Sequence, residues 1–204
     1  MKISLIGGSQ GTGAAIAALA RRAGHEVTVV SRSGAPMTGA RVIRGDATDP
    51  RTATEAVAGA DAVVITVGGA KGKDLHRTAV TQSIVSAMEA AGTDRLIVQS
   101  SLGAGGSATQ LPGVVGFITK MLLAKPLSDH NRQESLVQDS TLAWTIVRPT
   151  GLTDKEPLAS WTALEVTDAG TLKGTIPRRD LAAFMLQSLE DDATVGKAFG
   201  ISSR

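Results

Sequence analysis

The stretch Lys2–Gly13, KISLIGGSQGTG, decides the fold that this sequence predicts. Its β-favouring run at 3–6 leads directly into glycines, and an alanine-rich segment with helical character follows at 13–23. A strand, a glycine-rich turn and a helix in this order form the first unit of a parallel α/β sheet. We therefore expect the chain to open with a strand and to turn at the glycines into a helix.

The rest of the chain repeats this alternation. Short apolar runs with little polar alternation are typical of buried parallel strands, and they recur at 3–6, 26–31, 41–44, 62–67, 96–100, 144–147 and 198–201. Helical patterns lie between them at 13–23, 50–58, 75–91, 129–139 and 180–189. The fold class predicted is α/β, a doubly wound parallel sheet (Rossmann fold) in a single domain over 1–204. We interpret 102–128 as a loop and helix insertion on the substrate side, with 102–127 as a candidate lid.

Composition limits the classes of protein that fit. The chain has 204 residues, 42% hydrophobic and 20% charged, which suits one packed core. Its charges are dispersed and sum to only +2, so we expect no nucleic-acid partner. Without cysteine it has no thiolate metal site, and we predict no metal. The apolar opening is too short for a signal or a membrane span, so we expect a cytoplasmic protein that does not bind membranes, as a monomer or small homo-oligomer.

The glycine-rich turn predicts a dinucleotide site. Glycines there allow a tight turn and let the backbone approach a pyrophosphate, while the helix start offers free N–H groups to the phosphates. An ordinary strand-to-helix turn is the alternative, but the flanking strand and helix favour the dinucleotide. The candidate ligands in this turn are Gly7, Ser9, Gln10, Gly11, Thr12 and Gly13.

The end of the second strand indicates which dinucleotide binds. NAD sites usually carry an Asp or Glu there, whereas this strand ends in Ser31, Arg32 and Ser33. Arg32 can pair with a 2′-phosphate, and the two serines can donate hydrogen bonds to it. A solvated surface arginine is the alternative. The sequence therefore favours NADP(H) as the cofactor.

Two further strand ends supply candidate cofactor contacts. Asp46, followed by Ala47, could accept from the adenine amino group, or it could be a turn carboxylate. Val67, Gly68 and Gly69 would let the chain pass close to the adenosine ribose, although glycines also end strands.

Few residues could carry chemistry. The chain has no tyrosine, so the Tyr-x-x-x-Lys pair of many dehydrogenases is ruled out. Ser101 ends the fifth strand where nicotinamide should lie, and His130 opens the following helix, so we take both as candidate catalytic residues. A plain strand-ending serine and an exposed helix-start histidine are the alternatives.

Four neighbouring side chains receive structural interpretations. Gln133 and Glu134 follow His130 on the same predicted helix, and we expect them to be surface or structural residues. Trp144 begins a strand and should be core, whereas Trp161 lies in a polar segment and could line a substrate pocket.

Taken together, these motifs resemble the atypical short-chain dehydrogenase/reductases of the biliverdin-IXβ reductase/flavin reductase and NAD(P)H-binding type. The resemblance spans almost the whole chain. It implies that Arg32 binds the 2′-phosphate, that Ser101 stands beside nicotinamide with Ser100 among the cofactor contacts, and that Pro149 with Thr150 packs on the cofactor. The motifs that carry it are the glycine loop, 27–32, 45–47, 100–101, 129–130 with 133–134, 144–149, and 179–181 with Phe184.

Two features depart from that pattern. A second pocket histidine of the biliverdin reductases falls on Gly151, and Gly7, Gly11 and Gly13 follow the glycine spacing of the Tyr-Lys enzymes. The resemblance therefore implies an NADPH-dependent oxidoreductase whose small-molecule acceptor is planar and conjugated, a flavin, bilin or quinone. The alternative is a redox sensor, similar to NmrA-like proteins, that binds NADP(H) without turnover.

Overall fold

The computed structural model describes residues 1–69, 75–111 and 124–204. Eight strands form one sheet in the order β3-β2-β1-β4-β5-β6-β10-β8, and two short strands, β7 and β9, pair separately. The strands are β1 (Lys2–Ile6), β2 (Glu26–Ser31), β3 (Arg41–Arg44), β4 (Ala62–Ile65), β5 (Arg95–Gln99), β6 (Ala143–Pro149), β7 (Gly151–Thr153), β8 (Trp161–Glu165), β9 (Thr175–Pro177) and β10 (Lys197–Ser203).

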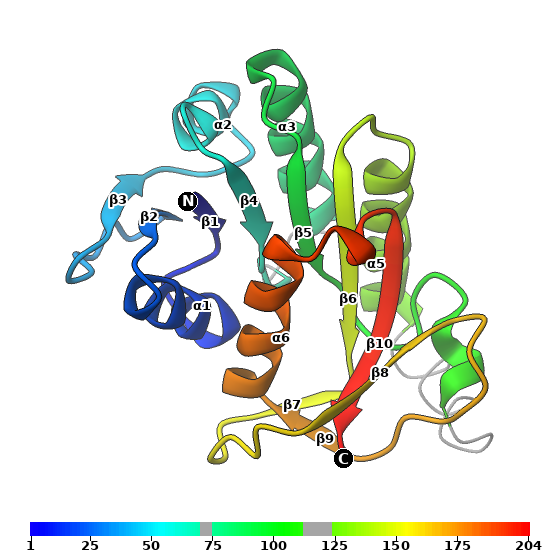
Figure 1. Cartoon of the computed structure of the whole chain (residues 1–204). Coiled ribbons are helices and arrows are strands. Elements are labelled where there is room, and N and C mark those ends of the chain that lie inside the picture. The colour runs from blue at the N-terminus through cyan, green and yellow to red at the C-terminus, as the bar shows by residue number, and fades with distance from the viewer. Residues whose placement is uncertain (70–74, 112–123) are drawn as a thin grey trace.

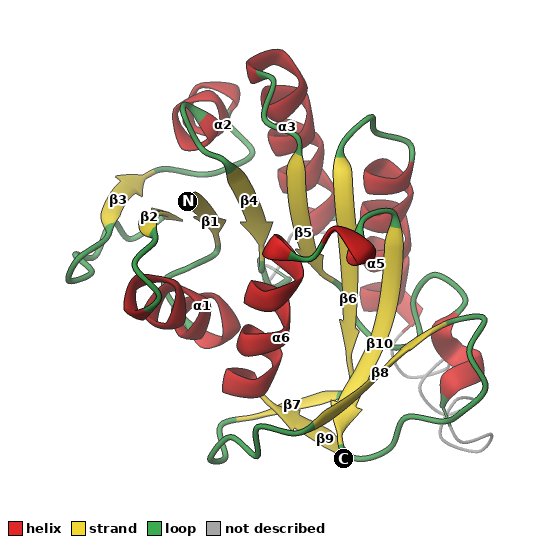
Figure 2. Cartoon of the chain, viewed as in Figure 1, coloured by secondary structure: helices red, strands yellow, loops and turns green. Residues whose placement is uncertain are grey.

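Helices cover both faces of the sheet, as Figure 1 shows, so the fold is the predicted doubly wound α/β fold. On one face lie α1 (Gly11–Arg22) and α6 (Arg178–Glu190), packed on each other; on the other lie α2 (Pro50–Val57), α3 (His76–Ala91) and α5 (Ala124–Gln138). Two short 3₁₀ turns, η1 (Ser107–Gln110) and η2 (Asp192–Thr194), complete the described elements (Figure 2).

The core consists of two apolar layers, one on each face of the sheet. One packs α2 and α3 through Ala53, Val80 and Ile84, and the other packs α1 and α6 through Ile16 and Leu181. The middle strands are buried on both sides; β4, for example, is buried along its whole length. This two-sided burial explains why their sequences show no polar alternation.

The order of the strands creates the place for a ligand. The chain moves from β1 outward through β2 and β3, then returns to the other side of β1 and builds β4, β5 and β6. Connections that leave β1 and β4 in opposite directions open a crevice at the carboxyl ends of these two strands. The predicted glycine loop follows β1 directly and therefore lies at this crevice.

Some predicted elements differ from the observed ones. β8 pairs antiparallel with β10 at the sheet edge, so the sheet is not wholly parallel, and neither β8 nor the β7–β9 pair was predicted. All five residues of β8 are half-buried, so it lacks the apolar run of a central strand. α5 begins at Ala124, five residues before the predicted start at 129. The candidate lid at 102–127 includes residues 112–123, which lie outside the described residues.

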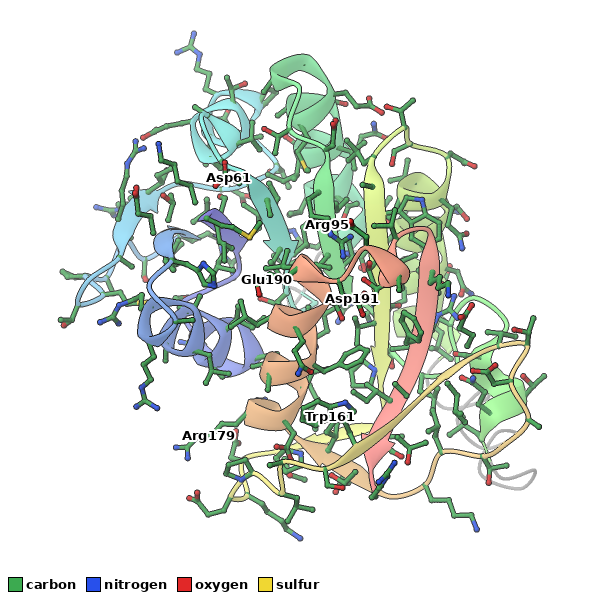
Figure 3. All side chains as sticks on the ribbon, viewed as in Figure 1. Asp61, Arg95, Trp161, Arg179, Glu190 and Asp191 are labelled. Atoms are coloured by element: carbon green, nitrogen blue, oxygen red, sulfur yellow. The ribbon has the colours of Figure 1, made fainter. Side chains whose placement is uncertain are left out.

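At the amino ends of the strands, Arg95 of β5 joins several elements. Its guanidinium donates to Ala143 O at 2.8 Å, to Thr145 Oγ1 at 3.0 Å and to Thr194 Oγ1 at 3.0 Å, and to the carbonyl oxygens of Ser188 and Leu189 in the last turn of α6. Figure 3 shows Arg95 close to the turn that carries Asp191. Burial lowers the pKa of Arg95, against the opposing charges of Asp192 and Asp191. Arg95 therefore ties α6 to the sheet on the edge opposite the crevice.

Candidate functional site

The glycine loop has the backbone geometry that a pyrophosphate site requires. Gly7 and Gly11 have φ angles of +89° and +55°, a region that L side chains rarely adopt. A Cβ on Gly13 would overlap the carbonyl oxygen of Gly7 and lie 2.8 Å from the Cα of Gly8. Gly7 and Gly11 thus shape the turn, and Gly13 lets α1 approach the loop.

The start of α1 is open to an anion. Its N-cap, Gln10, makes no side-chain capping hydrogen bond, and the first turn contains no acidic residue. The side chain of Arg178, at the start of α6, passes beside the loop, with its Nε 3.5 Å from where a Cβ on Gly11 would be. Free N–H groups, the helix dipole and a nearby cation all favour phosphate at this position.

A groove of about 610 Å³ extends from this loop across the ends of β2, β3 and β4. It is lined by most of the predicted cofactor residues: Gly7, Ser9, Gln10, Gly11, Thr12, Ser31, Arg32, Asp46, Ala47, Val67, Gly68 and Gly69. Gly13 and Ser33 do not line it. Gly13 acts through helix packing, whereas the Oγ of Ser33 lies 3.0 Å from that of Ser31.

At the far end of the groove, Arg32 is exposed and forms no salt bridge with the described residues. The hydroxyls of Ser31 and Ser33 lie beside it in one turn. Asp46 Oδ1 accepts from the backbone N–H and the hydroxyl of Thr48, at 3.0 Å and 2.9 Å, so this carboxylate closes a turn as the alternative interpretation proposed. The predicted contact of Asp46 with adenine stays a prediction.

A second cavity, of about 790 Å³, lies at the carboxyl ends of β5 and β6. It shares Thr66, Val67, Gly68, Gln99, Leu152 and Arg178 with the groove, so the two spaces meet. Besides the shared Val67 and Gly68, five further predicted site residues line it: Ser100, Ser101, His130, Pro149 and Thr150. A dinucleotide bound in the groove would therefore bring its nicotinamide end towards these residues.

A chain of buried polar groups stands behind Ser100. Its hydroxyl lies 2.5 Å from Glu134 Oε1 and 3.4 Å from His130 Nδ1. Glu134 also accepts two hydrogen bonds from Arg148, at 3.0 Å from Nε and 2.7 Å from Nη2, and each of the two side chains is only 2% exposed. Ser101 is outside this chain, because its Oγ donates to Leu102 O at 3.4 Å.

The surface alternative for Gln133 and Glu134 is wrong, because both are buried. Gln133 Nε2 donates to Thr81 Oγ1 of α3 at 2.9 Å, which fixes the neighbouring turn of α5. Sequence reasoning also missed Arg77 and Arg178, which line the second cavity, and Arg148 behind it.

His130 lies on α5, beside the contact of this helix with the start of α3. Asp129, the residue before it, accepts from the backbone N–H groups of Arg77 and Thr78 at 3.1 Å and 3.0 Å and so caps α3. Burial, and then the positive charge of Arg77, lower the pKa of His130 to about 4, against opposing contributions from Asp129 and Gln133. The imidazole is therefore neutral at pH 7, and it is buried rather than exposed as the alternative supposed.

A model of the NAD(P)H-binding family matches residues 7–192. The chain belongs to this family. A curated relative, 2′-dehydrokanamycin reductase of Streptomyces kanamyceticus, is 30% identical over 148 residues, which are 70% of this chain and 38% of the relative. The chain thus matches well under half of that relative's length.

Solved structures share the fold of this NAD(P)H-binding chain. ChuY, an anaerobilin reductase from Escherichia coli O157:H7, is 24% identical with a TM-score of 0.84, covering 100% of this chain and 97% of that one. A short-chain dehydrogenase/reductase from Veillonella parvula in complex with NADP is 17% identical with a TM-score of 0.83, covering 99% and 94%. These structures confirm the fold, and the family model confirms the NAD(P)H-binding family.

Three remaining expectations concern metal binding, membrane spans and the two tryptophans. Within 1–69, 75–111 and 124–204 no group of His, Cys, Asp or Glu is arranged to hold a metal ion. No helix among the described residues combines the length and apolarity that a bilayer span requires. Trp144 packs half-buried against one core layer, whereas Trp161 packs edge-on against Phe184 and does not line the cavity.

Proposed function

We propose that this NAD(P)H-binding protein is an NADPH-dependent reductase that transfers hydride to a planar, conjugated small molecule such as a flavin, a bilin or a quinone. The observation that carries the proposal is the continuity of the two spaces, in which a dinucleotide groove opens into a cavity of about 790 Å³ lined by Ser100, Ser101 and His130. A reductase among the curated relatives and a bilin reductase among the structural neighbours support the same class of reaction.

The residues of the groove fit NADPH. Gly7 and Gly11 have positive φ angles and Gly13 has no space for a Cβ, so the loop keeps a bare backbone; the open start of α1 with Arg178 beside it favours phosphate. Arg32, unpaired among the described residues and flanked by Ser31 and Ser33, suits a 2′-phosphate. We therefore assign Arg32 to the choice of NADPH over NADH.

In the second cavity, the chain's contribution is orientation. Bound NADPH supplies a hydride, which is a proton with two electrons. Ser101 and Ser100, with Pro149 and Thr150, form the walls that hold acceptor and cofactor in contact. His130 is neutral near pH 7, so we assign it to the cavity wall, and the proton that balances the transferred hydride comes from water. Planar conjugated acceptors suit this arrangement because the reduced product can take its proton from solvent.

Steady-state oxidation of NADPH tests the proposal. FMN, riboflavin, biliverdin and a panel of quinones would be offered in turn, and we expect turnover with at least one of them and a lower kcat/KM for Ser101→Ala with that acceptor. Asp139→Asn, at the exposed end of α5, is the control and should leave the rate unchanged. NADPH binding in the micromolar range without turnover of any acceptor would contradict a reductase.

A redox sensor that binds NADP(H) without turnover is the second candidate. It is favoured by the neutral His130 and by a cavity that has no carboxylate or tyrosine among its described lining residues. Such a protein should bind the reduced and oxidised cofactors with different affinities and should change the binding of a partner. Equal affinities together with acceptor turnover would exclude it.

A further inference from the structure

The hydroxyl of Ser100 can have only one direction in this structure. Glu134 pairs with the guanidinium of Arg148 through both of its oxygens, which stabilises the ionised carboxylate, so neither oxygen has a proton to give to Ser100. Ser100 Oγ lies 2.5 Å from Glu134 Oε1 and must donate its single proton there. Towards His130, Ser100 therefore presents only a lone pair.

This direction determines the tautomer of His130. The Nδ1 of the ring is 3.4 Å from Ser100 Oγ, and two facing lone pairs would repel, so Nδ1 carries the hydrogen. The burial and the charge of Arg77 that keep the ring neutral leave no proton for Nε2. Nε2 is not among the buried unpartnered atoms of the described residues. The side chain of Gln133 is a further hydrogen-bond partner of the ring and competes for its proton.

We propose that the Arg148–Glu134–Ser100 chain holds His130 as the Nδ1–H tautomer, so that Nε2 accepts a hydrogen bond from an N–H group of the bound acceptor. Glu134 and Arg148 are then positioning residues, and His130 contacts the substrate. The inference rests on the proposed function and narrows it, because flavins and bilins carry N–H groups whereas simple quinones have only carbonyl oxygens. The site selects an acceptor with an N–H at its edge.

The tautomer can be measured directly, without turnover. The chain has three histidines, so ¹⁵N-histidine NMR of the full protein with NADP⁺ at pH 7 gives few signals, and His130→Gln identifies those of the ring in question. We expect a protonated Nδ1 and an unprotonated Nε2. A proton on Nε2, directed at the otherwise unpartnered amide oxygen of Gln133, overturns the proposal.

A variant tests the role of Glu134. Glu134→Ala removes the acceptor of the serine proton, which frees the hydroxyl to donate to Nδ1 and moves the ring proton to Nε2. Asp139→Ala makes the same kind of truncation at the exposed end of α5 and should leave the tautomer unchanged. If Glu134→Ala does not fold, Ser100→Ala should populate both tautomers. An unchanged tautomer in whichever variant folds overturns the positioning role.

Two acceptors test the ligand class. FMN carries an N–H group and menadione carries none, so titration with FMN should shift the Nε2 signal and menadione should not. His130→Phe should raise the KM for FMN roughly three- to tenfold, the effect of one hydrogen bond, and leave that for menadione unchanged. Equal effects on both acceptors overturn the inference. If no acceptor of the panel is reduced, the proposed function fails, while the tautomer and the binding shifts still decide this inference separately.

Discussion

Under the proposed function, the preference for NADPH over NADH depends mainly on the side chain of Arg32. Replacing it by Ala removes a charge-assisted contact to the 2′-phosphate, which contributes about 1.5–3 kcal/mol. We therefore expect the ratio of NADPH to NADH affinity to fall roughly ten- to hundredfold, measured by fluorescence titration of both cofactors. Arg41→Ala is the matched control, because Arg41 lies on the neighbouring strand and pairs with Glu55 at 2.7 Å. A ratio that Arg32→Ala leaves unchanged would remove Arg32 from the site.

His130 couples the site to acid stability. Its pKa is about 4 in the folded chain against 6.5 when exposed, so between these values the unfolded state binds more protons than the folded one. The stability from keeping the ring neutral is fully present above pH 6.5, falls as the pH drops, and is lost below about 4. From pH 7 to 5 this amounts to about 2 kcal/mol. Urea unfolding of the protein and of His130→Gln should show a smaller loss for the variant; parallel curves would refute this.

Among the elements, α3 depends on a cap from another helix. Its own N-cap, Leu75, has a φ of +57° and no side-chain hydrogen bond, while Asp129 of α5 accepts from two backbone N–H groups at the helix start. Asp129→Ala should therefore cost about 1–2 kcal/mol in urea unfolding. Asp129→Asn retains an accepting oxygen and should cost less. Equal losses in the two variants would mean that charge, and not capping, dominates.

The loop after β5 packs on the buried ion pair through a glycine. Gly105 has a φ of +54°, and a Cβ there would overlap both Arg148 and Glu134, whereas Gly106, with a φ of +83°, has open space around it. Gly106→Ala should cost about 1 kcal/mol of backbone strain. Gly105→Ala must also displace the pair, and should cost about 3 kcal/mol or more. Similar unfolding free energies for both would show that the loop yields without disturbing the pair.

At the scale of the whole molecule, local sequence patterns predicted the sheet, but they did not predict contacts between residues far apart in the sequence. The glycines after β1 are required by positive φ angles and by the close approach of α1, and the unbroken apolar strands follow from two-sided burial, so the sheet and the groove follow from sequence. Glu134 could not be distinguished from a surface residue, because its burial depends on Arg148, which the strand order brings to it. β8 has no apolar run because it lies half-buried at the sheet edge.

The two edges of the sheet have different roles: side chains at the amino edge stabilise the fold, and side chains at the carboxyl edge form the site. Arg95 satisfies carbonyl groups in the last turn of α6 at the amino edge, whereas both cavities open at the carboxyl edge. Arg95→Met would remove all of these hydrogen bonds from the guanidinium, and we expect a loss of about 2–4 kcal/mol in urea unfolding. Affinity for NADPH should stay within about twofold at 25 °C, a difference below roughly 0.5 kcal/mol, because no cofactor contact changes. A large loss of NADPH affinity in a variant that is still folded would show that the amino edge also controls the crevice.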